Sequence, residues 1–376
     1  MTGQKKFSNN IHFPQLDGLR GIAILMVMCF HYFPHLPLCN FGWTGVDLFF
    51  VLSGFLITSR LLPYIDDSKL LLKFYRNRFL RIVPLYFGFL IVFFTGWFLL
   101  SSKATLHSFK FYEDHWWQFF LFIQNWTFIF EYVTITTHLS HLWSICVEEQ
   151  FYLVFPLFIT MIKEKRKLLN LGLVLILLVL LTRLIYYYYF FQDSEYQKIY
   201  WNTFFRMDSL LIGFILYMLI GKKSSILENK KYFKVFISAI IIILLAGIII
   251  SKTPVKNSMF MNTIGFTIIA IFYAGIIWIA LSNNNKTMNL ILTSGILRYT
   301  GKISYGLYVF HIPIFLIGFS LLNSLFIHLN YIPDKQTIHL INVLICIPAT
   351  YIVSHLSFKY YESYFLKHKA KMILKK

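Results

Sequence analysis

Ten apolar stretches, each about 17–25 residues long, constrain this chain more than any other feature. A helix of that length crosses the hydrocarbon core of a bilayer. The composition agrees, because 57% of the 376 residues are hydrophobic and 14% are charged, against about 45–50% and about 25% in soluble domains. We therefore expect an all-α integral membrane protein with spans near residues 16–34, 42–60, 83–101, 142–162, 169–190, 203–220, 233–251, 260–281, 302–322 and 338–357. A shorter, Trp-rich stretch at 115–130 is expected to be interfacial or re-entrant.

The lysines and arginines indicate the orientation of the spans. Of the 35, 27 fall in alternate segments that share one side of the membrane, and six fall in the loops on the other side. The positive-inside rule then places both ends of the chain in the cytoplasm. The net charge of +19 follows this topology pattern, so we expect no nucleic-acid partner. We expect one polytopic domain over residues 1–376, with cytoplasmic tails at 1–14 and 359–376.

The first span carries an arginine and a histidine eleven positions apart, Arg20 and His31. Eleven residues of α-helix turn through about 1100° and rise about 16 Å, so both side chains share one face at different depths. Arg20 is expected near the cytoplasmic surface and His31 near mid-membrane, where ionisable groups are costly and usually functional. A guanidinium suits phosphate and an imidazole suits proton transfer. The alternative is a topology anchor and a hydrogen-bonded core histidine.

Two adjacent carboxylates, Glu148 and Glu149, lie about 10–12 Å below the outer end of the span at 142–162. That depth is close to the one expected for His31. Neighbouring helical positions point about 100° apart, so the two glutamates should serve different partners. We expect one to orient a histidine or act as a base, and the other to pair with an arginine. The alternative is an interfacial pair wetted by a cavity.

A second histidine, His311, lies about 13–14 Å into the span at 302–322, which enters from the cytoplasmic side. Its depth again matches that of His31, and we expect it to support the site. The alternative is a packed histidine that bonds a backbone carbonyl. The sequence shows no metal-ligand spacing, and no metal is expected.

An arginine cluster precedes the span at 83–101 on the cytoplasmic side and consists of Arg76, Arg78 and Arg81. We interpret it as an entry patch for a phosphate-bearing donor. The alternative is a topology anchor beside anionic lipid.

Three more charged residues, Asp47, Arg206 and Asp208, lie near the outer ends of their spans. We expect structural ion pairs, with Asp47 bonded to Arg206 or Arg183. Small residues beside Asp47 should let helices or a ligand approach closely; these are Gly42, Gly45 and Gly54.

Together these segments resemble acyltransferase family 3, a family of membrane proteins that acylate bacterial surface glycans and some small molecules. The matching segments run in family order from about residue 15 to 315: LDGLRGIAILMVMCFH with its Arg-x10-His spacing, GVDLFFVLSGFLI, RNRFLRIVPLY, HLWSICVEEQFY, FRMDSLLIG and ISYGLYVFHIP. Within them, Ser53 and Tyr305 are expected to support the site.

The resemblance implies a cytoplasmic acyl-CoA donor, usually acetyl-CoA, which Arg20 contacts, and an essential histidine, His31. It implies a sugar hydroxyl as acceptor, on a cell-surface polysaccharide or its lipid-linked precursor, with possible glycan-assembly proteins as partners. The expected location is the bacterial inner (cytoplasmic) membrane. Some members carry an extracytoplasmic hydrolase-like domain, and the absence of a GDS motif leads us to expect none here.

Our hypothesis is therefore membrane O-acylation, with His31 as general base or transient acyl carrier and Glu148 or Glu149 holding its tautomer. A proton-coupled exporter of a polysaccharide unit or small molecule is the main alternative, because buried Arg, His and Glu also form proton relays. A non-catalytic partner in polysaccharide assembly is a second alternative.

Overall fold

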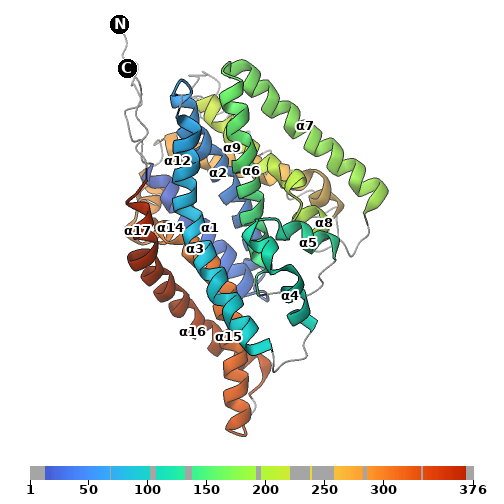
Figure 1. The fold of residues 1–376 in the computed structure, drawn as a ribbon, viewed down its shortest axis with the longest axis vertical. Coiled ribbons are helices and arrows are strands. Elements are labelled where there is room, and N and C mark those ends of the chain that lie inside the picture. Colours follow the sequence, from blue (N-terminus) through green and yellow to red (C-terminus); the bar gives the residue numbers. More distant parts are fainter. Residues whose placement is uncertain are drawn as a thin grey trace.

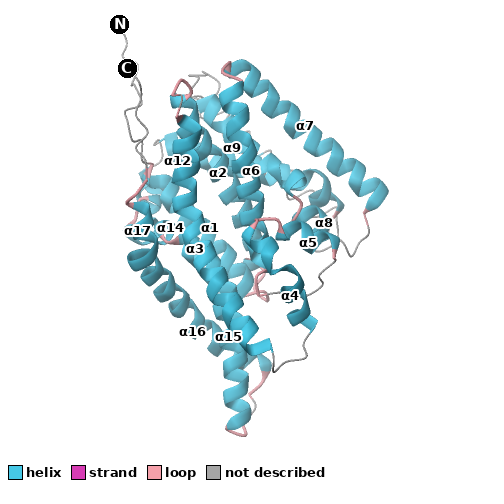
Figure 2. Cartoon of the chain, in the orientation of Figure 1, coloured by secondary structure: helices cyan, strands magenta, loops and turns pink. Residues whose placement is uncertain are grey.

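The computed structural model describes residues 13–67, 69–101, 107–131, 138–191, 196–220, 238, 258–282, 286–331 and 333–369. Throughout these residues the regular structure is helical, and no strand occurs among them (Figure 2). The protein is an all-α integral membrane protein, as the apolar stretches predict.

The longer helices follow the predicted spans closely. Their bounds are α1 (Pro14–Tyr32), α2 (Gly45–Leu61), α3 (Leu70–Ser101), α6 (Trp143–Met161), α7 (Lys165–Phe190), α9 (Thr203–Ile220), α12 (Phe266–Ser282), α15 (Ser304–His328) and α16 (Lys335–Leu356). Shorter helices lie between or after them: η1 (Cys39–Thr44), η2 (Leu62–Tyr64), α4 (His107–Phe120), α5 (Gln124–Phe130), η3 (Ser140–Leu142), α8 (Tyr196–Tyr200), η5 (Met261–Gly265), α13 (Lys286–Leu292), α14 (Gly295–Lys302), η6 (Ser357–Glu362) and α17 (Ser363–Leu366).

Eight helical segments among the described residues are long and apolar enough to cross a membrane, and each coincides with a predicted span. The first predicted span, 16–34, forms α1, which is not among these eight. Its charged Asp17 and Arg20 make it less apolar than they are. The predicted span at 233–251 lies outside the described residues. The last helical run reaches Leu366, so the predicted tail at 359–376 begins as a structured arm.

The helices divide into a packed centre and a lipid-facing edge. The core gathers around α1, α2, α6 and α9, whereas α7 runs along one edge of the bundle (Figure 1). Only four residues of α7 are buried, and four of its leucines are exposed: Leu173, Leu177, Leu178 and Leu181. Apolar side chains exposed on a long helix are expected where lipid is the solvent.

The Trp-rich stretch at 115–130 contains parts of two short helices, α4 and α5, and neither is long enough to span a bilayer. The helical conformation is interrupted between them at Phe122, which adopts a positive φ of 55°. Trp116 and Trp117 of α4 remain exposed, as expected for aromatic side chains at a membrane interface.

Two close helix crossings fix the centre of the bundle. Gly54 of α2 and Gly213 of α9 each lie against the other helix's backbone carbonyls, so an added Cβ would collide there. This contact also brings together the predicted ion pairs. Asp47 bonds Arg206 at 2.5 Å, and Asp208 bonds Arg183 at 2.8 Å, all four side chains fully buried. Charges without solvent must be paired, so the prediction of structural pairs is confirmed.

A second close crossing joins α1 to α14. Gly21 of α1 lies against the carbonyl of Leu297, and Gly301 of α14 lies against the carbonyl of Asp17. The absence of side chains lets α14 lie directly on the N-terminal half of α1. At the other end of α1, a disulfide joins Cys29 to Cys39 of η1, a pairing that the sequence reasoning missed.

Candidate active site

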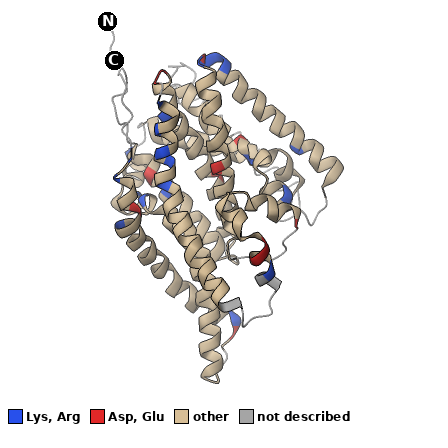
Figure 3. Cartoon of the chain, viewed as in Figure 1, with Lys and Arg blue, Asp and Glu red and all other residues tan. Residues whose placement is uncertain are grey.

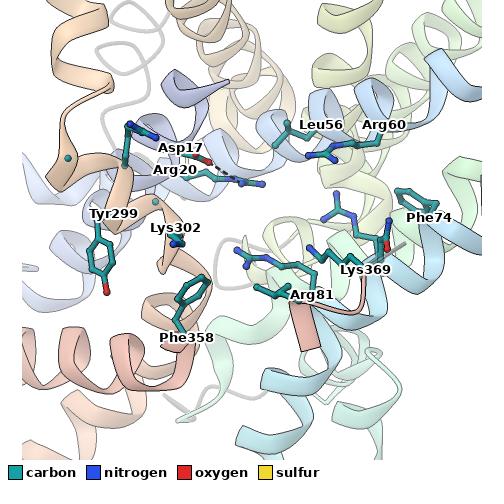
Figure 4. Close-up of a pocket in the computed structure, with 16 residues that line it drawn as sticks. Asp17, Arg20, Leu56, Arg60, Phe74, Arg81, Tyr299, Lys302, Phe358 and Lys369 are labelled. Atoms are coloured by element: carbon teal, nitrogen blue, oxygen red, sulfur yellow. Dashed lines mark ion pairs between the residues drawn. The ribbon is translucent and has the colours of Figure 1, made fainter. Parts of the chain in front are cut away.

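A cavity of about 700 Å³ opens where α1, α2, α3, α14 and the C-terminal residues meet. Its wall carries seven basic side chains and one acid: Arg20, Arg60, Arg78, Arg81, Arg298, Lys302, Lys369 and Asp17. Figure 4 shows Arg20, Arg60 and Arg81 approaching the same space from three different helices. Lysines and arginines also gather along this end of α3, whereas its remaining length is almost free of charge (Figure 3). Such a concentration of cations suits a ligand with several phosphate groups.

Helical geometry decides which arginines reach this cavity. Arg78 and Arg81 of α3 are three residues apart and share a face, so both line it. Arg76 lies about 200° around the helix from Arg78. Its guanidinium instead donates to the carbonyl of His368 at 3.1 Å. Of the three arginines in the predicted patch, Arg76 therefore does not line the cavity. Four further basic residues do line it and were missed from the sequence: Arg60, Arg298, Lys302 and Lys369.

A narrow cavity of about 90 Å³ continues inward from the basic one and shares Arg20, Arg78 and Arg81 with it. Glu148 lines this narrow cavity and accepts a hydrogen bond from Ser53 at 2.7 Å and one from Tyr152 at 3.4 Å. Tyr152 in turn lies 4.1 Å below the guanidinium of Arg78, a cation–π contact. The carboxylate is thus part of the passage, beside the arginines.

The two glutamates do not take the expected place at His31. Glu148 lies one helical turn beyond Ser144, and Ser144 bonds Tyr308, itself one turn before His311. Along the helix axes this separates Glu148 from His311 by about 10 Å. Glu149 points elsewhere, as the 100° rotation predicts, and its Oε1 is buried with no hydrogen-bond partner in the described part of the chain. The rise per residue gave the approximate depth of Glu148 but not its partners.

His31 and His311 are in direct contact, which confirms their predicted equal depth. Nε2 of His311 lies 3.2 Å from Nδ1 of His31, and the two rings are 5.0 Å apart. Nδ1 of His31 also lies 2.9 Å from the carbonyl oxygen of Val27, one turn earlier in α1. His311 is fully buried, whereas His31 is only partly buried.

The partners of the two histidines assign their tautomers. Nδ1 of His311 is 2.7 Å from the carbonyl of Tyr308, so this nitrogen carries a proton and Nε2 is an acceptor. Nδ1 of His31 faces that acceptor and the Val27 carbonyl, so it too carries a proton. The lone pair of neutral His31 is therefore on Nε2, as a general base or nucleophile requires. His311 and the Val27 carbonyl do what we expected of a glutamate.

A third histidine, His141, completes this cluster and was missed from the sequence. Its ring packs against that of His311 with 5.0 Å between centroids. Its Nε2 lies 3.2 Å from the carbonyl of Val309, whereas its buried Nδ1 has no hydrogen-bond partner among the described residues.

Within the residues that the structure describes, no group of three or more His, Cys, Asp or Glu is arranged to hold a metal ion.

The narrow cavity and the histidines are separated by one layer of side chains. Ser144 and Tyr308 line the inner end of the cavity and bond each other at 2.6 Å. Tyr308 also packs against His311, with ring centroids 5.6 Å apart. The basic cavity, the narrow cavity at Glu148 and the histidine pair therefore follow one another, with Ser144 and Tyr308 between the narrow cavity and the histidines.

The remaining predicted site residues fall into two groups. Ser53 and Tyr305 line the narrow cavity, and the Tyr305 hydroxyl donates to the carbonyl of Ile82 at 3.0 Å. Asp47, Arg206 and Asp208 belong to the buried ion pairs and line neither of the two cavities.

Comparison with known proteins identifies a family and several relatives of this chain. The model of a family described as an acyltransferase domain matches residues 13–358. A Staphylococcus aureus protein (strain COL) with the provisional name O-acetyltransferase is 29% identical over 99% of this chain and 60% of its own length. The peptidoglycan O-acetyltransferase OatA of Listeria monocytogenes is 28% identical over 93% of this chain and 55% of its own length. The chain thus spans little more than half the length of these relatives. No solved structure matches it.

Proposed function

The chain belongs to acyltransferase family 3, and on that premise we propose that it is an O-acetyltransferase of the bacterial cytoplasmic membrane. The proposed donor is acetyl-CoA, bound from the cytoplasm. The proposed acceptor is a hydroxyl group of a cell-envelope glycan, in keeping with the peptidoglycan O-acetyltransferase named among the relatives. The observation that carries the proposal is the series of a basic cavity, a narrow cavity and the His31–His311 pair.

Coenzyme A suits both parts of this series. Its diphosphate and its ribose 3′-phosphate suit the cavity around Arg20, Arg78 and Arg81, because arginine binds phosphate oxygens bidentately. Its thin pantetheine arm suits the narrow cavity at Ser53 and Glu148, and its amide N–H groups can donate to the carboxylate. The thioester is thereby directed along α1 towards His31, about 16 Å from Arg20 by helix rise.

In the proposed reaction, Nε2 of His31 takes the proton of the acceptor hydroxyl while the oxygen attacks the thioester carbonyl. The new C–O bond forms, the C–S bond breaks, and the imidazolium returns its proton to the leaving thiolate. Val27 and His311 hold Nδ1 of His31 throughout, as the carboxylate does in a catalytic triad. Trapping of an acetyl group on His31 in the absence of acceptor would replace this direct transfer by a two-step relay.

The test is acetylation in isolated membranes that contain the chain. Radiolabelled acetyl-CoA is added, and the label is counted in the envelope glycan and in the released coenzyme A thiol. His31→Ala, at equal abundance in the membrane, should lower transfer by at least about 10²-fold, the usual contribution of a general base. Substantial transfer by this variant contradicts the catalytic assignment. Export of intact glycan without consumption of acetyl-CoA contradicts the proposal that the chain is an acetyltransferase.

A further inference from the structure

The C-terminal arm, residues 357–369, contributes one wall of the basic cavity. Phe358, Leu366 and Lys369 line the cavity, and the ammonium of Lys302 lies 5.0 Å over the Phe358 ring. Predicted as a tail, this segment instead continues from α16 and turns back over the arginine cluster on α3.

Two hydrogen bonds fasten the arm to α3. The hydroxyl of Tyr361 donates to the carbonyl of Pro84 at 3.1 Å. Seven residues further along the arm, the carbonyl of His368 accepts a hydrogen bond from Arg76 at 3.1 Å. The second bond immediately precedes Lys369 and so fixes where its backbone meets the cavity. This gives Arg76 a role that differs from the predicted contact with the donor.

We propose that Lys369 is a phosphate-binding residue of the donor site and that the arm holds it there for a polyanionic ligand. The assignment rests on the proposed acetyl-CoA donor and deepens it. Lys369 is brought into an environment that is unfavourable for a cation unless an anion joins it. Charged groups of several elements surround it. Arg20 and Asp17 of α1, Arg60 of α2, Arg78 and Arg81 of α3, and Arg298 and Lys302 of α14 line the same cavity. Arg76 of α3 bonds the carbonyl of the preceding residue, and Glu362 of the arm lies near Arg81.

The protonation of Lys369 supports this assignment. Lys369 remains exposed at the rim of the cavity, but desolvation by the cavity wall, and then the positive charges of Arg81, Arg78, Arg60 and Arg20, lower its pKa to about 7. Phosphate oxygens placed among these cations reverse that repulsion and raise the pKa again. Above pH 7 the free protein therefore lacks the proton that the complex holds, so binding takes up a proton. The affinity for coenzyme A should therefore fall as the pH rises above about 7. It should level off once the pH exceeds the pKa of Lys369 in the complex.

The experiment is calorimetric binding of coenzyme A to the purified full chain at pH 8. Lys369→Met should weaken binding by about tenfold, the value of one charge-assisted hydrogen bond. Lys367→Met is the matched control, because Lys367 is also a lysine of the arm, lies two residues away and does not line the cavity. Lys369→Arg should keep most of the affinity, because a guanidinium stays charged at this pH.

Proton uptake is read from the same titrations in two buffers of different ionisation enthalpy. At pH 8 the wild-type protein should take up close to one proton more than Lys369→Arg, whereas at pH 6 the two should agree. Equal affinity of wild type and Lys369→Met, or equal proton uptake of wild type and Lys369→Arg, overturns this assignment alone. Failure of the wild-type chain to bind coenzyme A overturns the proposed donor as well.

Discussion

The histidine pair shows how far single residues can be assigned from sequence. Arg20, His31 and His311 could be selected because ionisable side chains within apolar stretches are costly, and helix rise gave the two histidines the same depth. The 3.2 Å contact confirms that inference. The same arithmetic was wrong for the partner of His31, because depth does not state which neighbours a carboxylate meets. Glu148 bonds Ser53 instead.

The role of His311 leads to a prediction about its substitutions. Gln can place a carbonyl oxygen where Nε2 of His311 accepts from His31, whereas Leu removes this acceptor from Nδ1 of His31. His311→Leu should therefore lower kcat by about 10–10²-fold, with little change in the KM for acetyl-CoA, and His311→Gln should recover part of the loss. Steady-state kinetics on both variants check this. Equal losses in both, or a loss confined to KM, would show that His311 acts in another way.

At the scale of helices, periodicity predicts which arginines of the basic cluster share a face. Arg78 and Arg81 share a face of α3, and Arg76 faces away; this follows from 100° per residue alone. The contributions of Arg60, Arg298, Lys302 and Lys369 could not be foreseen, because they depend on tertiary packing. Gly21 and Gly301 bring α14 onto α1, and the C-terminal arm turns back onto α3.

The two faces of α3 provide a matched pair of substitutions. Arg81→Met removes a cation from the cavity and should weaken coenzyme A binding about tenfold, with a smaller dependence of affinity on salt. Arg76→Met removes the same charge from the same helix and one of the two bonds that hold the arm. Because the Tyr361 bond to Pro84 remains, its effect should be smaller, below about threefold. Titration at two ionic strengths distinguishes them. Equal weakening by both variants would mean that net charge, rather than the cavity, attracts the donor.

At the scale of the whole molecule, the fold class and eight of the ten predicted spans follow from hydropathy and length. Hydropathy has this power because a bilayer leaves few structures for an apolar stretch of about 20 residues. It does not give the order in which helices pack. That order depends on the Gly54–Gly213 crossing and on the Asp47–Arg206 and Arg183–Asp208 pairs, which join α2, α7 and α9.

The arrangement also predicts sidedness. Arg20, the arginine cluster on α3 and Lys302 all border the basic cavity, and the positive-inside rule places this end of the bundle in the cytoplasm. The cavity should therefore accept its donor from the cytoplasmic face alone, while Cys39 and its disulfide lie towards the opposite face, where disulfides persist.

Acetyl transfer in sealed membrane vesicles of opposite orientation tests the central claim most directly. Labelled acetyl-CoA, which does not cross a bilayer, is supplied outside inverted or right-side-out vesicles, and label is counted in the glycan. We predict incorporation only in inverted vesicles, which expose the cytoplasmic face, and none above background with His31→Ala. Equal incorporation by intact right-side-out vesicles, or undiminished incorporation by His31→Ala, would contradict a donor path from the basic cavity to His31.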